Sequence, residues 1–330
     1  MEPIYRLGID FILWLQGLGG WLEIPMKVFS FLGTEDFFML ALPIVYWSVS
    51  TQAGLRIGVI LLLSGSLNDT LKLVLHGPRP YWVSSEMKVL AAETSFGVPS
   101  GHAQIAASLW GLAAALLARP WAWGAGVFII CMIGLSRLYL AVHFPHDVLV
   151  GWTLGALVLL AFLRCWDAVA AWANKKSPGQ QVGLALALSL AVLLCGIIAF
   201  WSSRGWVMPV DWTANSRLGG AAVLPAPVTL NNAITFSAVL FGMLAGLVWM
   251  DSRGGYTAEG LLRQRVLRLL PGLAVIFIIS LGLRALFPRG DELIPYVLRY
   301  LRFALIGLWI SAGAPWLFVK LKLARDLNHG

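Results

Sequence analysis

Charged residues are scarce in this sequence. Asp, Glu, Lys and Arg make up 12% of its 330 residues, and 59% of the residues are hydrophobic. Soluble domains carry about 25% charged residues, and the mean hydropathy of +0.79 agrees with that contrast. A soluble globule is therefore excluded, and the composition predicts a polytopic α-helical membrane protein.

Cysteine is also rare. Cys131, Cys165 and Cys195 are isolated from one another, and each falls in or beside an apolar run. This spacing excludes a zinc pattern and a disulfide framework, so we expect the three side chains to be packing residues. The N-terminus lacks a short apolar core followed by a small-residue cleavage site, and no removable signal peptide is predicted.

Basic residues outnumber acidic ones, giving a formal net charge of +8. They are scattered among apolar spans and short loops instead of forming one patch. The pattern therefore argues against a nucleic-acid partner, and membrane orientation accounts for it better.

Long apolar runs bounded by polar, Gly or Pro residues predict membrane-spanning helices. The runs lie at about 37–50, 53–75, 103–118, 121–138, 148–163, 182–201, 233–250, 269–287 and 296–319. The stretch 7–31 is interrupted by Gly, Glu, Pro and Lys, so it is either a first spanning helix or an interfacial one. Nine or ten spans are expected in an all-α polytopic membrane protein.

A polar segment, 167–181, divides the apolar runs into two groups and contains Lys175-Lys176-Ser177-Pro178-Gly179. It predicts a core at 1–166, with 1–31 as its interfacial or first spanning helix, then a connector at 167–181. The remaining region, 182–330, is expected to form four membrane helices, whose role the sequence leaves open.

Three polar clusters lie at the ends of apolar runs in the first group. Ionisable groups in such positions are functional by default, because burying them in hydrocarbon costs several kcal/mol unless they are paired or wet. The clusters combine three cations, two imidazoles, a hydroxyl and a carboxylate, which suits the binding and cleavage of a phosphate ester. They are Lys72 with Arg79-Pro80, then Pro99-Ser100-Gly101-His102, and finally Ser136-Arg137 with His143 and Asp147.

Each residue type has a chemical use in that reaction. Ser100 is placed to cap the helix that follows it, and free amides at a helix N-terminus bind phosphate. Asp147 lies four residues after His143, within reach for holding that imidazole in one tautomer. A neutral histidine can then attack phosphorus, while His102 protonates the leaving oxygen.

Each cluster also has a structural alternative. Lys72 can snorkel to the interface and pair with Asp69. Ser100 can act as a cap alone, and Arg137 can pair with Asp147 beside a core histidine. Each alternative explains one cluster, but none explains all three at the ends of spans on one membrane side.

With their full spacing, the three clusters resemble the tripartite signature of the type 2 phosphatidic acid phosphatase superfamily. The resemblance covers roughly Phe31 to Leu163. That superfamily includes lipid phosphate phosphatases, undecaprenyl pyrophosphate phosphatases, glucose-6-phosphatase and vanadium haloperoxidases. The resemblance implies a helical-bundle core, to which this chain adds about four C-terminal transmembrane helices.

The same resemblance implies the role of each residue. His143 would be the nucleophile that forms a phosphohistidine, Asp147 would orient it, and His102 would be the general acid. The phosphoryl oxygens would be held by Lys72, Arg79, Ser100, Gly101 and Arg137. No metal and no cofactor are implied. His76 and His146 fall outside the matched positions and are expected to be supporting or interfacial residues.

The residues around the three clusters indicate the subfamily less clearly than the clusters indicate the superfamily. The flanks Arg79-Pro-Tyr-Trp and Ser136 to His146 look especially like glucose-6-phosphatase. Asp147, however, matches the bacterial lipid phosphatases, and the glucose-6-phosphatase pattern departs there.

Function and orientation follow as expectations. Lys and Arg concentrate in the turns opposite the clusters, which places those turns in the cytoplasm. We therefore expect a bacterial inner-membrane protein with its site on the periplasmic or extracellular side. Its partners would be the bilayer and a lipid phosphate or diphosphate substrate, with polyprenyl diphosphates such as undecaprenyl diphosphate first. A lipid phosphotransferase, a sugar-phosphate phosphatase, or a lipid or ion transporter are the alternatives.

Overall fold

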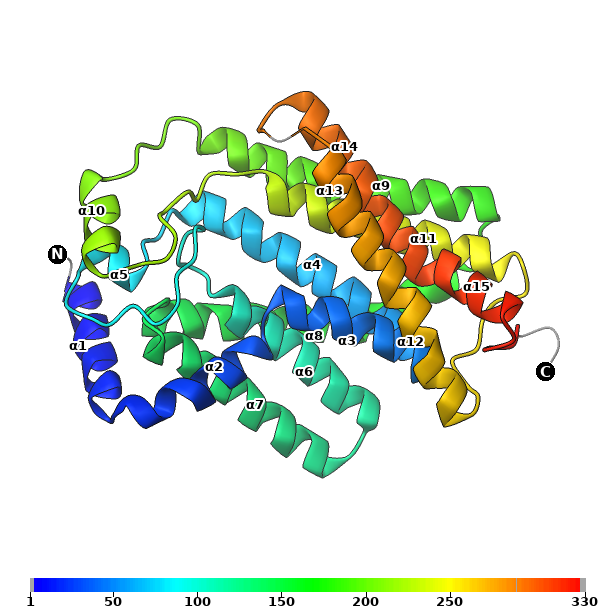
Figure 1. Cartoon of the computed structure of the whole chain (residues 1–330), viewed down its shortest axis with the longest axis horizontal. Coiled ribbons are helices and arrows are strands. Elements are labelled where there is room, and N and C mark those ends of the chain that lie inside the picture. The colour runs from blue at the N-terminus through cyan, green and yellow to red at the C-terminus, as the bar shows by residue number, and fades with distance from the viewer. Residues whose placement is uncertain (1–2, 289, 327–330) are drawn as a thin grey trace. The chain divides into compact units, whose positions relative to one another are not determined.

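The computed structural model describes residues 3–288 and 290–326. Within them every regular element is helical, from α1 (Pro3–Gly17) to α15 (Ala314–Lys320) (Figure 1). Two compact units interleave along the chain. The first comprises Met1–Phe37, Leu67–Ala161 and Ile197–Thr229, and the second comprises Phe38–Ser66, Phe162–Gly196 and Leu230–Gly330.

Seven helices of the described residues are long and apolar enough to cross a membrane, and α6 (Gly101–Leu117) is a shorter apolar helix. The prediction of an all-α polytopic fold is confirmed, including four candidate spans in the C-terminal region. The expected nine or ten spans exceed this number, partly because α3 (Glu35–Ser48) has only 14 residues. The candidate spans are Thr51–Val83, Pro120–Tyr139, Pro145–Ala173, Pro178–Ser202, Asn231–Asp251, Leu262–Leu286 and Leu293–Lys320.

The N-terminal stretch, 7–31, is not one spanning helix. It is divided into α1, a short 3-10 turn (Gly20–Leu22) and α2 (Glu23–Phe31). Gly19 has a φ of 118°, which glycine adopts readily and other residues rarely do. With 15 and 9 residues, α1 and α2 are each shorter than the ~20 residues that a crossing needs.

The polar segment 167–181 is mostly helical and not an extended connector. Helix α8 (Pro145–Ala173) continues through its first half, and α9 (Pro178–Ser202) begins within it. The interruption is confined to 174–177, because a proline restricts the residue before it and suits the first helical position. The functional division at this segment stays a prediction.

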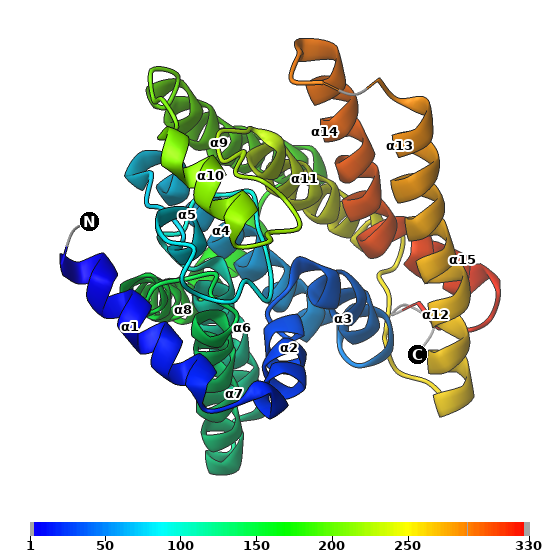
Figure 2. The same ribbon diagram turned by 60° about the vertical axis from the view of Figure 1, so that its left-hand side comes forward.

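The first unit contains the three polar clusters and a core that holds them. Helices α6 and α7 (Pro120–Tyr139) pack side by side, and α2 packs on α7 (Figures 1 and 2). The short α5 (Pro80–Val83) packs against α10 (Val210–Leu218). Tyr81, Trp82 and Phe96 are fully buried there, so the loop 84–100 is fastened to the unit by aromatic packing at both ends.

The second unit is built around α11 (Asn231–Asp251) and α14 (Leu293–Leu308), which pack closely. A Cβ atom added to Gly307 would meet the Val239 carbonyl oxygen at 2.4 Å, and Gly242 is equally tight against the backbone of α14. Small residues therefore allow the two helix backbones to approach each other. The unit also contains α12 (Leu262–Phe277) and α13 (Leu283–Leu286), joined by a π-helical turn (Figure 2).

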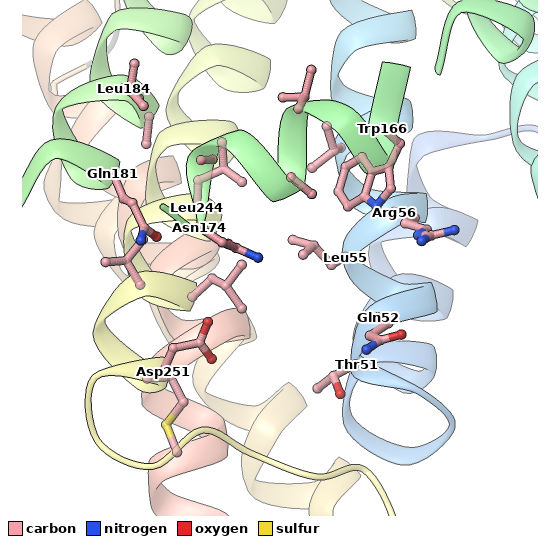
Figure 3. A pocket seen from close by; sticks show the side chains of 18 of the residues that line it. Thr51, Gln52, Leu55, Arg56, Trp166, Asn174, Gln181, Leu184, Leu244 and Asp251 are labelled. Carbon is pink, nitrogen blue, oxygen red and sulfur yellow. The ribbon is translucent and has the colours of Figure 1, made fainter. Parts of the chain in front are cut away.

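A cavity of about 680 Å³ lies within the second unit, between the adjoining ends of α4 (Thr51–Leu75), α8, α9 and α11. Gln52, Asn174, Gln181 and Asp251 bring polar side chains to it, while Leu55, Leu184 and Leu244 contribute apolar wall (Figure 3). The predicted phosphate site, in contrast, belongs to the first unit.

The three cysteines are not packing residues, and that expectation was wrong. Cys131, Cys165 and Cys195 are free and exposed on α7, α8 and α9. A small apolar side chain on a spanning helix can face hydrocarbon as readily as a protein core, so its position in an apolar run does not distinguish the two.

Candidate active site

The three polar clusters come together in the first unit. One hydrogen bond joins the second cluster to the third. Another joins Asn68, one helical turn before Lys72, to the second cluster. A short nitrogen–nitrogen approach joins the first to the third. The contacts are Ser100 N–H to the Asp147 carbonyl at 3.0 Å, Asn68 Nδ2 to the Pro99 carbonyl at 3.2 Å, and Arg79 Nη1 to His143 Nε2 at 3.3 Å.

His143 lies in the turn between α7 and α8, and its side chain is completely buried. Its Nδ1 is 3.3 Å from Asp147 Oδ2, and the same oxygen accepts the Phe144 N–H at 2.9 Å. Asp147 follows the first-turn Pro145 of α8, as the sequence predicts. With Nδ1–H donated to the carboxylate, Nε2 carries the lone pair and faces the Arg79 guanidinium.

Burial lowers the pKa of His143 well below its ordinary value, and the positive charge of Arg79 lowers it further. Arg137 and Lys72 act in the same direction, while the Glu93 carboxylate opposes them. The imidazole is therefore neutral at pH 7, which is the form that can act as a nucleophile.

This lowered pKa gives a spectroscopic prediction. In protein labelled with ¹⁵N-histidine at pH 6, the His143 nitrogens should show the shifts of a neutral imidazole, although an exposed histidine with a pKa near 6.5 is largely protonated there. The signal is assigned by its loss in His143→Gln. A titration midpoint near 6.5 for that signal would contradict the buried, cation-flanked environment.

Arg79 is completely buried and uses its whole guanidinium group. Nε donates to the Ser95 carbonyl at 2.7 Å, and Nη1 donates to the Val142 carbonyl at 2.8 Å. Nη2 donates to Glu93 Oε2 at 2.7 Å and to Ser95 Oγ at 3.0 Å. Arg79 is therefore a fixed cation whose position is set by loop 84–100 and by the α7–α8 turn together.

Arg137, in the last turn of α7, meets the same carboxylate from the other direction. Its Nη2 donates to Glu93 Oε1, and its Nη1 donates to the Ser30 hydroxyl of α2. It does not pair with Asp147 in the described structure, so the alternative of an Arg137–Asp147 ion pair does not hold. Glu93 bridges the two arginines, one oxygen to each.

Lys72 is buried on the last turns of α4, with 8% of its surface exposed. Its Nζ donates to Ser95 Oγ at 3.0 Å, and that hydroxyl also accepts from Arg79. This burial contradicts the alternative in which the Lys72 side chain snorkels to the membrane interface. All three predicted cations thus converge on the segment 93–95.

Several buried polar atoms of the site lack a hydrogen-bond partner in the part of the chain that the structure describes. They include Ser100 Oγ, His102 Nε2 and Arg137 Nε. Ser100 occupies the N-cap position of α6 without capping it through its side chain. Such orphaned groups are costly in a core, and one anion with several oxygens would satisfy hydroxyl, guanidinium and helix-terminal amides together.

The structure gives a steric explanation for glycine at position 101. A Cβ atom there would lie 2.9 Å from Asn68 Oδ1. Asn68 also donates to Gln104 Oε1 at 2.9 Å, so a side chain at position 101 would displace an Asn68 side chain that is held in place by hydrogen bonds. The sequence had suggested only that glycine lets an anion approach.

The two histidines outside the matched positions differ. His146 Nε2 lies 3.2 Å from Asp147 Oδ1, and its ring stacks on Phe144. His76 Nε2 lies 3.0 Å from the Ser203 hydroxyl, in contact with the rings of Phe96 and Trp206. His146 thus adjoins the site, whereas His76 belongs to the aromatic packing beside it.

Glu93 is the site residue that the sequence did not single out. It lies in loop 84–100 with Glu86, and nothing in residue type or spacing separates the two. Burial by itself would raise the pKa of Glu93, but Arg79, Arg137, His102 and Lys72 hold it well below its usual range. Glu93 is therefore a carboxylate in the middle of the predicted phosphate-binding cations.

A family model described as "PAP2 superfamily" matches residues 53–171, which contain all the predicted site residues. A second, "PAP2 superfamily phosphatase, transmembrane extension", matches residues 234–326. Together they match more than half of the chain. This protein belongs to the PAP2 superfamily. It is an integral membrane protein of that superfamily, and its C-terminal helices α11 to α15 correspond to the transmembrane extension.

Two relatives indicate the range within the superfamily. "Glucose-6-phosphatase 3" of Bos taurus is 28% identical over 242 residues, covering 65% of this chain and 66% of the relative. "Undecaprenyl-diphosphatase" of Sulfolobus acidocaldarius is 33% identical over 109 residues, covering 31% of this chain and 52% of the relative. The chain thus spans between about half and two thirds of the length of these relatives.

One solved structure is also similar. It is the "first transmembrane PAP2 type phosphatidylglycerolphosphate phosphatase from Bacillus subtilis", with 22% identity and a TM-score of 0.44. The match covers 51% of this chain and 89% of that one.

Proposed function

We propose that this phosphatase hydrolyses a lipid phosphate or diphosphate through a phosphohistidine on His143. The observation that carries the proposal is the neutral, buried His143 held between Asp147 and Arg79 beside orphaned hydrogen-bond donors. His143 Nε2 attacks phosphorus, and the bond from phosphorus to the leaving oxygen breaks as His102 protonates that oxygen. Water then cleaves the phosphorus–nitrogen bond and releases inorganic phosphate.

Charge stabilisation supplies most of the catalysis in such a transfer. Lys72, Arg79 and Arg137 provide three fixed cations around the phosphoryl group. Ser100 and the amides at the start of α6, including that of Gly101, provide neutral donors. These residues and His102 account for the oxygens of a phosphoryl group and its leaving oxygen without a metal ion in the proposed cycle.

A lipid is the favoured substrate class, and a polyprenyl diphosphate such as undecaprenyl diphosphate is the first candidate. The site residues sit at the ends of candidate spans, where a lipid can present its headgroup from the bilayer. The relative named undecaprenyl-diphosphatase supports this choice. The excess of Lys and Arg in the opposite turns supports a site on the outer face of a bacterial inner membrane.

A sugar phosphate is the second candidate. It is favoured by the relatives named glucose-6-phosphatase, which align with more of the chain than the undecaprenyl-diphosphatase does. The matched family model that is described as a phosphatase favours hydrolysis over transport as the explanation of the buried ionisable residues.

A substrate comparison tests the proposal. Purified protein should release phosphate from undecaprenyl diphosphate with a kcat/KM at least about tenfold above that for glucose 6-phosphate, because a lipid adds binding energy from its apolar tail. EDTA should leave the rate unchanged. A preference for glucose 6-phosphate would select the second candidate, and a rate abolished by EDTA and restored by a divalent cation would contradict the metal-free cycle.

A further inference from the structure

Glu93 occupies the place where the proposed reaction needs a phosphoryl group. Its Oε2 accepts from Arg79 Nη2 at 2.7 Å, and its Oε1 accepts from Arg137 Nη2. The Ser95 hydroxyl stands next to it, accepting from Arg79 and from Lys72. The three cations that should hold phosphate oxygens are therefore bound to oxygens of the protein itself.

We propose that the Glu93 carboxylate fills the phosphate position in the free enzyme and must be displaced by the incoming phosphoryl group. This inference rests on the proposed function of the site. It concerns a residue that the family signature and the sequence left unassigned.

The position of the carboxylate relative to the nucleophile supports a phosphate-like placement. Arg79 Nη2 holds Glu93, while Nη1 of the same guanidinium lies 3.3 Å from His143 Nε2. One planar group thus separates the carboxylate from the nucleophilic nitrogen. A phosphoryl group bound through the same Nη2 and through Arg137 would lie beside His143, as an attack on phosphorus requires.

Displacement needs a side-chain rotation and no loop rearrangement. The Tyr81 hydroxyl donates to the Glu93 carbonyl at 2.8 Å and accepts the Glu93 N–H at 2.9 Å. The next residue is also fixed, since the Thr94 carbonyl accepts the Ala226 N–H at 3.0 Å. The Glu93 side chain, in contrast, is 27% exposed, so it has an open direction into which it can turn.

Charge then decides which ligands can replace it. A monoanion that displaces Glu93 forms ionic contacts with the two arginines that only replace those the carboxylate gives up, because each anion carries one negative charge. A phosphomonoester dianion brings a second charge, and Lys72 and the orphaned donors of Ser100 and Arg137 can bind its further oxygens. A terminal, dianionic phosphoryl group should therefore displace the carboxylate at a lower concentration than a diester does.

A permanent structural role for Glu93 predicts the opposite result on mutation. If the carboxylate only aligned two arginines that would otherwise repel each other, its removal would disorder them and weaken anion binding. If it competes with the ligand, its removal raises the fraction of binding-competent enzyme, and apparent affinity rises by that factor. The direction of the change thus distinguishes the two roles.

The experiment measures competitive inhibition by orthophosphate at pH 8 in wild type, Glu93→Gln and Glu86→Gln. We expect Glu93→Gln to bind orthophosphate about tenfold more tightly, as for a site filled by its own carboxylate about nine-tenths of the time. Glu86→Gln is the matched control, since Glu86 lies in the same loop and pairs with Arg6 at 2.9 Å. Its inhibition constant should equal that of wild type.

A second ligand tests whether displacement of the carboxylate is common to all anions that enter the site. At pH 8, above its second pKa, orthophosphate is largely a dianion, whereas dimethyl phosphate is a monoanion. Wild type should bind orthophosphate more tightly than dimethyl phosphate, and Glu93→Gln should bind both about tenfold more tightly, because the competent fraction of the enzyme is the same for the two ligands. Tighter binding of orthophosphate alone would contradict displacement of one resident carboxylate by both anions.

The outcomes separate this inference from the proposed function. If wild type binds orthophosphate and Glu93→Gln binds it equally or more weakly, the proposed role of Glu93 is wrong, but the proposed phosphate site stands. Orthophosphate binding that is absent in both proteins contradicts the phosphate site itself. Binding that appears or tightens only in Glu93→Gln supports both. Thermal denaturation of each variant shows whether a weaker binder is simply less folded.

Discussion

Replacing His143 with alanine is expected to lower kcat for phosphate release by at least about 10⁴-fold, the scale on which removal of a nucleophile acts. The side chain is completely buried, its Nδ1 faces Asp147 and its Nε2 faces Arg79. No other described imidazole has that pair of neighbours. The loss should fall on kcat, because the cations that are proposed to bind phosphate remain in place.

Two measurements separate lost chemistry from lost folding. Wild type that is mixed with ³²P-labelled substrate and quenched in alkali should retain acid-labile label, as a phosphohistidine does, and His143→Ala should retain none. His143→Ala should still bind orthophosphate, since Arg79 and Arg137 do not depend on His143 for their other hydrogen bonds. A variant that keeps turnover within tenfold of wild type would remove His143 from the reaction.

The convergence of the three clusters could be predicted from the sequence because each sits at an end of an apolar run. Alternation of spans then brings such ends to one membrane side, whatever the details of packing. Lys72 at the end of α4, Ser100 before α6 and Arg137 at the end of α7 follow this rule. Local chemistry was also readable: Asp147, one helical turn after His143, meets its imidazole.

Glu93 could not be predicted, because its role depends on how loop 84–100 folds back. The loop is fixed by contacts far apart in sequence, such as Gln16 with the Lys88 N–H at 3.0 Å and Tyr81 with Glu93. Neither hydrophobic periodicity nor a motif specifies these. Net charge within the site offered one usable signal, since three converging cations with Asp147 as the single carboxylate imply a further carboxylate or a bound anion nearby.

Span number was predicted less well than span position. Apolar content alone cannot show that Gly19 turns the chain between α1 and α2, or that α8 continues to Ala173 through polar residues. Helical propensity and tertiary packing override hydropathy at such ends. The C-terminal helices were found correctly, yet their matching to a transmembrane extension came from comparison and not from composition.

Replacing His102 with alanine is expected to lower kcat/KM for an alkyl phosphate by about 10²- to 10⁴-fold, the usual contribution of a general acid. His102 stands in the first turn of α6, and its Nε2 has no hydrogen-bond partner within the described residues. That nitrogen is available to a leaving oxygen. An alkoxide needs its proton in the transition state, whereas a nitrophenolate leaves without one.

The leaving group therefore distinguishes acid catalysis from positioning. With p-nitrophenyl phosphate, His102→Ala should lose less than about tenfold in kcat/KM, which reports the steps up to phosphohistidine formation. Ser108→Ala serves as the control, since Ser108 is buried on the same helix and donates to the Ile105 carbonyl of that helix at 3.1 Å. Equal losses on both substrates would mean that His102 positions the phosphoryl group and transfers no proton, and the reaction would then need another acid near Arg137.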